Sequence, residues 1–266
     1  MRSRGKTFKV FFQKGLIFFV VFALTSHVAA QTWSEILPVG TAPPFRCYGA
    51  SSVYDPGSNR LILFGGNSCL GFSFNDVWVL ANADGTGAPQ WIQLAPTGGP
   101  PVSRNNHTAV YDAANNRLVI FGGCAGGCLP TLNDVWVLTN ANGLEAGAPN
   151  WVQLSATGGP PAARQNSRAA YESVTNRMIV FGGQDGGGSL ATVFEEIWVL
   201  ANANGLEAGT PTWSQLSPMG APVSGTIGYY LASMVYDATA NRMTVFGGLP
   251  KSPPASLTRE RGQVLY

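Results

Sequence analysis

The sequence is poor in charged residues and in histidine. Charged residues make up 11% of the chain, against about 25% in a typical soluble domain. The only two histidines are His27 and His107, which argues against a transition-metal centre with several imidazole ligands. Aromatic residues also make up 11% of the chain. A chain with few charges and many aromatic residues can form a core and is not expected to be disordered.

The first thirty residues have the composition of a secretory leader. All five of their charged residues are basic, an apolar run follows at 16–25, and Val28-Ala29-Ala30 precedes Gln31. This order predicts a signal peptide over 1–30 and a secreted or periplasmic protein. A membrane anchor is the alternative, but Lys14 and His27 leave only twelve residues between them, and spanning takes about 20.

Removal of the leader changes the charge balance. Residues 1–30 contain five of the 16 basic residues and none of the 14 acidic ones, so the mature chain carries a net charge of −3. A chain of this composition has no basic patch that would attract nucleic acid or an anionic membrane. We therefore expect neither as a partner.

The strongest signal is an internal repeat. Each of four segments contains a Tyr, a polar turn, an Asn-Arg pair, an apolar run and a Gly-Gly doublet. A Trp-containing run, such as NDVWVL at 75–80, follows three of them, and a second one, such as WIQL at 91–94, comes after it. The four segments are YDPGSNRLILFGG (54–66), YDAANNRLVIFGG (111–123), YESVTNRMIVFGG (171–183) and YDATANRMTVFGG (236–248). Successive copies begin 57, 60 and 65 residues apart. A repeat of this length indicates a fold built from similar modules.

Each repeat predicts four short antiparallel strands. The second is a continuous apolar run, which indicates burial on both faces. Repeated four-stranded sheets that are apolar on both faces stack as the blades of an all-β propeller. The doublets at one position of every unit indicate a backbone that requires glycine. They are Gly65 and Gly66, Gly122 and Gly123, Gly182 and Gly183, and Gly247 and Gly248.

These repeats resemble those of the kelch family, and the resemblance covers residues 33–248. It implies a kelch-type β-propeller domain over 31–248, followed by an irregular tail at 249–266. Kelch proteins are mostly binding modules, and a minority, such as galactose oxidase, are enzymes. Galactose oxidase-like sites hold copper through two His and two Tyr. After leader removal this chain keeps only His107, so neither a copper site nor any other cofactor is expected.

The tryptophans recur at two positions of the repeat, which favours packing between blades over a sugar-binding platform. On the third strand they are Trp78, Trp136 and Trp198, and on the fourth they are Trp33, Trp91, Trp151 and Trp213. The Glu195-Glu196 pair is the only adjacent acidic pair, but it replaces the Asn-Asp of the other units. We therefore interpret it as part of the entry to the third strand and not as a catalytic pair. Loops such as NANG at 140–143 resemble calcium loops faintly, but Asn-Gly is ordinary turn chemistry.

Candidate binding residues precede or begin the first strand of each unit, where the sequence departs from the repeat. A kelch-type blade places these positions at one mouth of the central channel, and function often lies on variable loops of a rigid scaffold. The candidates are Arg46, Tyr48, Arg104, Asn106, His107, Arg164, Arg168 and Tyr229.

These features lead to three hypotheses of function. The first is a secreted, non-catalytic module that recognises a protein or a glycan at this mouth. The second is a secreted carbohydrate-active enzyme, either galactose oxidase-like or a hydrolase or lyase. The third is a structural module of a larger extracellular assembly.

The four cysteines form an even set, and oxidation is expected in an exported protein. Propeller geometry places all four on the mouth face. Cys47 and Cys69 belong to one unit, and Cys124 and Cys128 belong to one loop. We predict the disulfides Cys47–Cys69 and Cys124–Cys128, with a four-cysteine zinc site as the alternative.

The repeat pattern stops after Gly248. We therefore expect an isolated fourth strand at Trp33, three full blades, and the first two strands of a fourth. Either GQVLY (262–266) supplies a poor third strand in a rare four-bladed ring, or the chain is a truncated piece of a larger propeller. The sequence favours truncation, because a propeller removes its exposed strand edges only by closing.

Overall fold

The computed structural model describes residues 33–186, 191–218, 231–248 and 263–265. The predicted signal peptide, Tyr229 and most of the tail lie outside these residues. The chain divides into two units, 1–35 and 36–266, and all strands belong to the second. No helix in the described part of the chain could cross a membrane.

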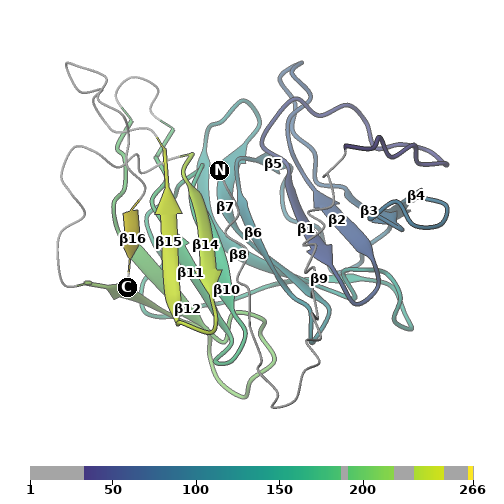
Figure 1. The fold of residues 1–266 in the computed structure, drawn as a ribbon. Coiled ribbons are helices and arrows are strands. Elements are labelled where there is room, and N and C mark those ends of the chain that lie inside the picture. The colour runs from purple at the N-terminus through teal and green to yellow at the C-terminus, as the bar shows by residue number, and fades with distance from the viewer. Residues whose placement is uncertain (1–32, 187–190, 219–230, 249–262, 266) are drawn as a thin grey trace, which may run out of the picture. The chain divides into compact units, whose positions relative to one another are not determined.

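Four antiparallel sheets follow one another along the chain, and each corresponds to one repeat (Figure 1). Blade 1 contains β1 (Ser51–Asp55), β2 (Arg60–Phe64), β3 (Val77–Ala81) and β4 (Gln90–Leu94). Blade 2 contains β5 (Arg104–Asn105), β6 (Thr108–Asp112), β7 (Arg117–Ala125), β8 (Thr131–Thr139) and β9 (Asn150–Gln153). Blade 3 contains β10 (Arg168–Glu172), β11 (Arg177–Phe181), β12 (Ile197–Ala201) and β13 (Thr212–Leu216). Blade 4 contains β14 (Ser233–Asp237), β15 (Arg242–Phe246) and β16 (Gln263–Leu265). The all-β kelch-type architecture predicted from the sequence is confirmed.

The same tight hairpin joins the first two long strands of every blade. An acidic residue pairs in register with an arginine, as Asp55 does with Arg60. The residue before that arginine is an asparagine at positive φ, a conformation that Asn tolerates well. The repeat Tyr donates its hydroxyl hydrogen to that Asn, as Tyr111 does to Asn116 at 3.0 Å. The Tyr and the Asn-Arg pair of the repeat therefore build this turn.

The hydrophobic core lies between successive blades. Trp151 of β9 packs against Phe64 of β2 with ring centroids 5.0 Å apart, and Trp213 of β13 packs against Phe121 of β7 at 5.2 Å. Both tryptophans are 2% exposed. The inter-blade role predicted for these two tryptophans is confirmed, and it explains why the aromatic positions recur once per unit.

The Gly-Gly doublets also connect neighbouring blades, and all eight glycines have positive φ. The Gly66 N–H donates to the Arg104 carbonyl of blade 2 at 2.9 Å, and the Gly123 N–H donates to the Arg164 carbonyl of blade 3 at 2.9 Å. A Cβ at Gly122 would lie 2.7 Å from that second carbonyl oxygen. Glycine is required both by the backbone conformation and by the close approach of the next blade.

Two expectations about the ends of the repeat region need correction. Residues 33–38 form no strand, and only Val39 makes an isolated parallel bridge, with Gln90. The predicted fourth strand at Trp33 is therefore wrong, because no strand edge pairs with it among the described residues. Conversely, the tail that was expected to be irregular contains β16, which agrees with the alternative in which GQVLY (262–266) supplies a third strand. β16 pairs antiparallel with β15, whose edge would otherwise keep unpaired backbone groups.

Candidate functional site

At the mouth end of the blades, the strands β1, β6, β10 and β14 begin. The Gly-Gly doublets that follow the apolar runs of the second strands lie at the same end. A chain of backbone hydrogen bonds links the blades there. The Asn106 N–H donates to the Gly49 carbonyl at 2.8 Å, Asn166 donates to Asn106 at 2.8 Å, and Leu231 donates to Asn166 at 3.3 Å. All four residues have positive φ. Asn106, a predicted binding residue, therefore connects blade 1 to blade 3.

Three predicted binding residues, Arg46, Arg104 and Arg164, have buried side chains with 7%, 0% and 0% exposure. Each donates to the first Gly carbonyl of its own doublet and pairs with the acid two residues before the third-strand tryptophan, as Arg104 does with Gly122 and Asp134. They are thus a repeat feature and not variable surface residues. The recurrence of Arg before every complete blade was the signal for this role.

Arg104 makes the best geometry of the three. Its Nη1 and Nη2 atoms lie 2.7 and 2.8 Å from the two oxygens of Asp134. Burial opposes the ionisation of Asp134, but its hydrogen bonds and the charge of Arg104 outweigh that cost and hold the pKa of this carboxyl below its usual range. Such bidentate pairs are among the strongest polar contacts in proteins. This arginine is fully engaged within its blade.

His107 is buried behind the mouth. Its Nε2 atom lies 2.6 Å from the Ser51 Oγ, and its ring meets Phe64 edge-on at 5.1 Å. Burial, together with the nearby charge of Arg104, lowers the pKa of His107 to about 3. Its Nδ1 atom has no hydrogen-bond partner. Ser51 and His107 therefore lack the acid that orients the base of a hydrolytic triad, and the imidazole is a poor proton acceptor near neutral pH.

The structure forms a Cys47–Cys69 disulfide, one of the two pairs expected from the sequence. The expected Cys124–Cys128 bond is absent, and both residues are free thiols. Their sulfur atoms converge instead on Oδ1 of Asn105, at 3.2 and 3.3 Å. This polar contact replaces the covalent one. Among the described residues, no cluster of three or more His, Cys, Asp or Glu side chains could hold a metal ion.

Two further candidates are Arg168 and Tyr229. Arg168 is half-buried at the start of β10 and donates to the carbonyls of Ala232 and Ser167. Burial lowers the pKa of its guanidinium. It thus connects blade 3 to blade 4. Tyr229 lies outside the described residues.

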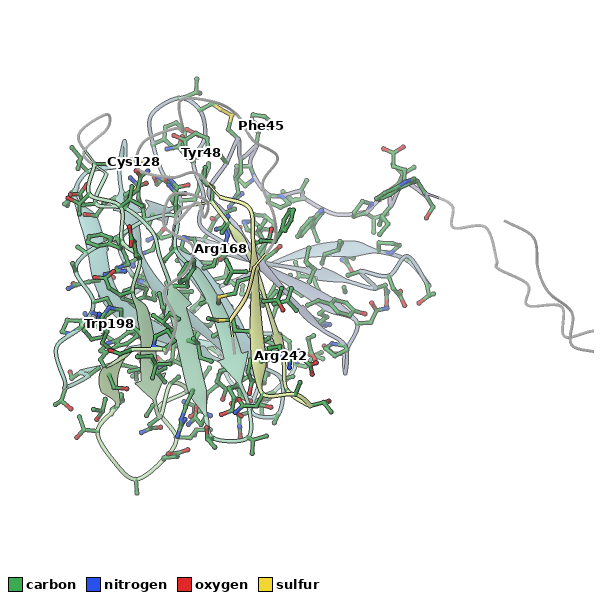
Figure 2. All side chains as sticks on the ribbon, turned by 60° about the vertical axis from the view of Figure 1, so that its left-hand side comes forward. Phe45, Tyr48, Cys128, Arg168, Trp198 and Arg242 are labelled. Carbon is green, nitrogen blue, oxygen red and sulfur yellow. A yellow bond between two sulfur atoms is a disulfide. The ribbon has the colours of Figure 1, made fainter. Side chains whose placement is uncertain are left out.

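Tyr48 is the one described candidate that presents a large exposed apolar surface, and it has neighbours of the same kind. We define the mouth patch as Phe45, Tyr48, Leu70 and Phe72, which are 77%, 49%, 82% and 51% exposed. They lie on two blade 1 loops joined by the disulfide and by the Cys47 N–H, which donates to the Asn67 carbonyl at 2.8 Å. Figure 2 shows Phe45 and Tyr48 at the same end of the molecule as Cys128.

The sequence alone did not identify Phe45 and Leu70 as surface residues. Each lies within two positions of a disulfide cysteine. Cysteine spacing was therefore the signal that could have found them. Apolar residues next to a cross-link in a short loop have few places to be buried.

Comparison with known proteins shows the family. The model of the KLHDC2/KLHL20/DRC7 Kelch-repeats domain matches residues 18–248. Adagio-like protein 3 of Oryza sativa subsp. japonica is 30% identical over 224 residues, covering 84% of this chain and 31% of that protein. Tip elongation aberrant protein 1 of Schizosaccharomyces pombe is 24% identical, covering 84% of this chain and 18% of that protein. The chain thus spans less than a third of the length of these relatives.

Among solved structures, that of YjhT is similar in fold. It superposes with a TM-score of 0.51 at 15% sequence identity, covering 77% of this chain and 60% of the other. The repeats, the blade topology and the matching domain model agree. The chain belongs to the kelch-repeat family.

Proposed function

We propose that this protein is a non-catalytic kelch module that binds another protein through the mouth patch. The observation that carries the proposal is the exposure of four large apolar side chains on two cross-linked loops. Contiguous exposed apolar surface on a soluble domain often marks an interaction site. Aromatic residues in particular supply much of the binding energy of protein interfaces.

The loops that carry the mouth patch are held in place before any partner arrives. Besides the disulfide, the Asn67 N–H donates to the Tyr48 carbonyl at 2.9 Å, and the Ser68 N–H donates to the Phe72 carbonyl at 3.0 Å. The rings of Phe72 and Phe74 meet edge-on at 5.5 Å. A preorganised surface loses less conformational entropy on binding. These contacts favour recognition by a rigid surface.

The polar residues of the mouth support binding rather than catalysis. Arg46, Arg104 and Arg164 are paired within their blades, and His107 has a pKa of about 3. None of these four is poised to transfer a proton near neutral pH or to attack a substrate. An apolar surface with little free charge suits a protein partner better than a glycan.

We also propose that residues 1–30 direct export and are removed before Gln31. The basic start, the apolar run and the small residues at 28–30 support this. The Cys47–Cys69 disulfide suits an oxidising compartment. The intact mass of the exported protein should lack residues 1–30, and recovery of the uncleaved chain in the membrane fraction would contradict export.

The binding proposal is tested by selecting a displayed peptide library against the immobilised protein. Selected peptides should lose at least tenfold in affinity for a Phe45→Ser/Leu70→Ser variant, because an apolar anchor site is lost. The matched control is Val174→Ser, since Val174 is 85% exposed in the β10–β11 turn, away from the mouth. Equal binding by all three proteins would contradict the mouth patch. A glycan array in parallel tests the other ligand class.

A further inference from the structure

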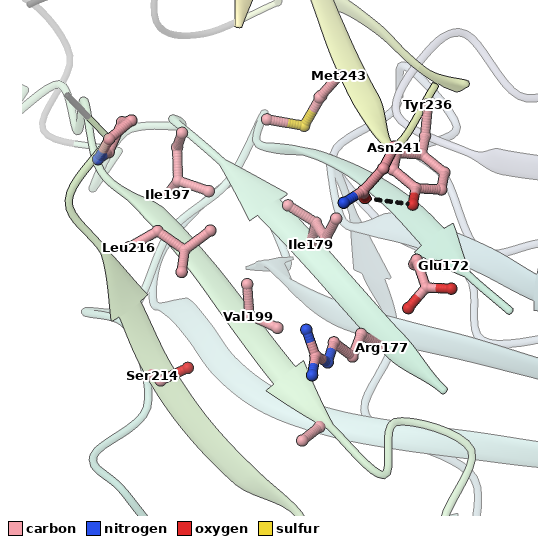
Figure 3. A pocket seen from close by; sticks show the side chains of 12 residues that line it. Glu172, Arg177, Ile179, Ile197, Val199, Ser214, Leu216, Tyr236, Asn241 and Met243 are labelled. Atoms are coloured by element: carbon pink, nitrogen blue, oxygen red, sulfur yellow. Dashed lines mark hydrogen bonds between the residues drawn. The ribbon is translucent and has the colours of Figure 1, made fainter. Parts of the chain in front are cut away.

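A groove of about 430 Å³ lies on the face of blade 3 that points toward blade 4. Glu172 and Arg177 flank one end of it, and Ile197 and Leu216 lie toward the other (Figure 3). Ile179, Val199 and Met243 contribute to its apolar lining. The corresponding faces of blades 1 and 2 are covered by the next blade. The contacts on those two covered faces therefore indicate which kind of segment could cover the groove on blade 3.

On the blade 1 face, the loop between β8 and β9 supplies the polar cover. Asn142 donates from Nδ2 to the Asp55 carboxylate at 2.8 Å, and its own carbonyl accepts from the Arg60 guanidinium at 3.0 Å. Asn142 therefore satisfies both ends of the Asp–Arg hairpin of blade 1. Burial lowers the pKa of Arg60, consistent with this cover.

The blade 2 face repeats this contact. Asn204, from the loop between β12 and β13, donates from Nδ2 to Asp112 at 2.7 Å, and its carbonyl accepts from Arg117 at 2.9 Å. Ile62 and Val119, in the middle of β2 and β7, are 1% and 0% exposed under their covering blades. The same loop motif, Asn-Ala-Asn-Gly, thus covers two successive blades in the same way.

Blade 3 presents the same acceptor and donor without that cover. Glu172 and Arg177 pair in register as Asp55 and Arg60 do. Among the described residues, no side-chain amide reaches Glu172, and no carbonyl accepts from Arg177. Arg177 is exposed, and Ile179, which corresponds to Ile62, is only half-buried. Arg177 and an apolar strip are therefore open on one face. The neighbouring Glu172 is 8% exposed, and within the described part of the chain its carboxylate accepts only from Val174 and Thr175 of its own turn.

We propose that this groove binds a β-hairpin of the type that covers blades 1 and 2, supplied by another polypeptide segment. Such a hairpin has two apolar strands and an Asn-x-Asn-Gly loop. The amide of its second Asn donates to Glu172, and the carbonyl of that Asn accepts from Arg177. The apolar strands cover Ile179 and Val199. This is an interaction surface distinct from the mouth patch.

The charge of the groove selects among possible hairpins. In blade 1 of this chain, the position of Asn142 is held by Asp84, which contacts Asn59 as Asn142 contacts Asn116. The blade 1 hairpin of a second copy would therefore bring a carboxylate against Glu172. Like charges in close contact are unfavourable. The amide-bearing hairpin is the occupant that fits.

The test measures binding of a synthetic peptide with the sequence of residues 133–154 to the full protein by fluorescence anisotropy. The unmodified peptide should bind saturably. A peptide carrying Asn142→Asp should bind at least tenfold more weakly, because it loses the amide donor and adds a carboxylate. Glu172→Gln in the protein should restore most of that loss, since the repulsion is removed. Arg177→Met should weaken the unmodified peptide several-fold.

Matched controls separate this site from the mouth patch. Phe45→Ser should leave peptide binding unchanged, and melting curves of all variants establish that they are folded. No saturable binding, or equal binding of both peptides, would overturn the proposal. Concentration-dependent dimerisation that blocks the peptide would also overturn it, in favour of a second copy as the occupant.

Discussion

Blades 2 and 3 each anchor a buried arginine to the acid two residues before the third-strand tryptophan, but the acids differ. In blade 2, Asp134 accepts from both terminal nitrogens of Arg104 and from Trp136 Nε1 at 2.8 Å. In blade 3, Glu196 reaches only Nη1 of Arg164, at 3.3 Å. Nη2 of Arg164 and Nε1 of Trp198 are buried without a partner.

Two features separate the blades here. Glu196 is longer than Asp134 by one methylene group, and β8 continues past Val135 through a register shift next to Asp134, whereas β12 begins at Ile197. The shorter Asp carboxylate lies between the arginine and the tryptophan and contacts both, and the longer Glu does not. A buried hydrogen-bond donor without a partner lowers the free energy of unfolding. The comparison teaches that a conserved charge does not guarantee a conserved contact. Blade 2 should therefore be the better-anchored of the two.

The largest expected effect comes from removing the arginine. Arg104→Ala should lower the free energy of unfolding by about 3–5 kcal/mol, because it leaves the partly buried Asp134 without its ion-pair partner. Arg164→Ala should cost less, about 1–3 kcal/mol, since Glu196 is more exposed than Asp134 and makes a single contact. Urea denaturation measures both. Equal losses would contradict the ranking of the two blades.

Exchanging the two acids should make the stability contribution of each blade more like that of the other. Glu196→Asp should raise the free energy of unfolding by about 1–2 kcal/mol, because it offers acceptors to two unpaired buried donors. Asp134→Glu should lower it by a similar amount. The same denaturation experiment applies to both variants. If Glu196→Asp destabilises the protein, the length of the acid is not the cause.

Much of the fold could be predicted from the sequence because the repeat is local and periodic. The spacing from Tyr to Gly-Gly, and the continuous apolar strand between them, identified four blades of the correct type. The site was less accessible. Arg46, Arg104 and Arg164 were interpreted as binding residues because they stand beside variable positions, whereas their burial depends on Asp and Glu residues about thirty positions later. Each of these pairs lies within one repeat, but which acid an arginine contacts depends on how the strands pair in the folded sheet.

A smaller difference between blades 2 and 3 concerns titration. His107 precedes β6, and Ser167 occupies the same place before β10. Burial, with the charge of Arg104, lowers the pKa of His107 from 6.5 to about 3. The unfolded chain therefore binds more protons between these pH values, and stability falls as the pH decreases through this window. The slope is at most about 1.4 kcal/mol per pH unit for one proton.

His107→Ser, which copies blade 3, should flatten the dependence of stability on pH between about 4.5 and 6.5. Thermal melting across this range measures the change. Ser167→Ala is the control and should leave the slope unaltered. Carboxylates with lowered pKa values, such as Asp134, lose their contribution at lower pH in every variant. An unchanged slope in His107→Ser would show that the imidazole is accessible to protons in the folded state.

The smallest expected effect concerns the blade 2 loop with two thiols, where blade 3 has none. Burial raises the pKa of Cys124, so its reactive thiolate is scarce. The unfolded, unreduced protein should show two thiols by titration, and Cys128→Ser should reduce the count to one while changing stability by no more than about 0.5 kcal/mol. Absence of thiols would establish the Cys124–Cys128 bond. Four thiols would contradict the Cys47–Cys69 disulfide that holds the mouth patch.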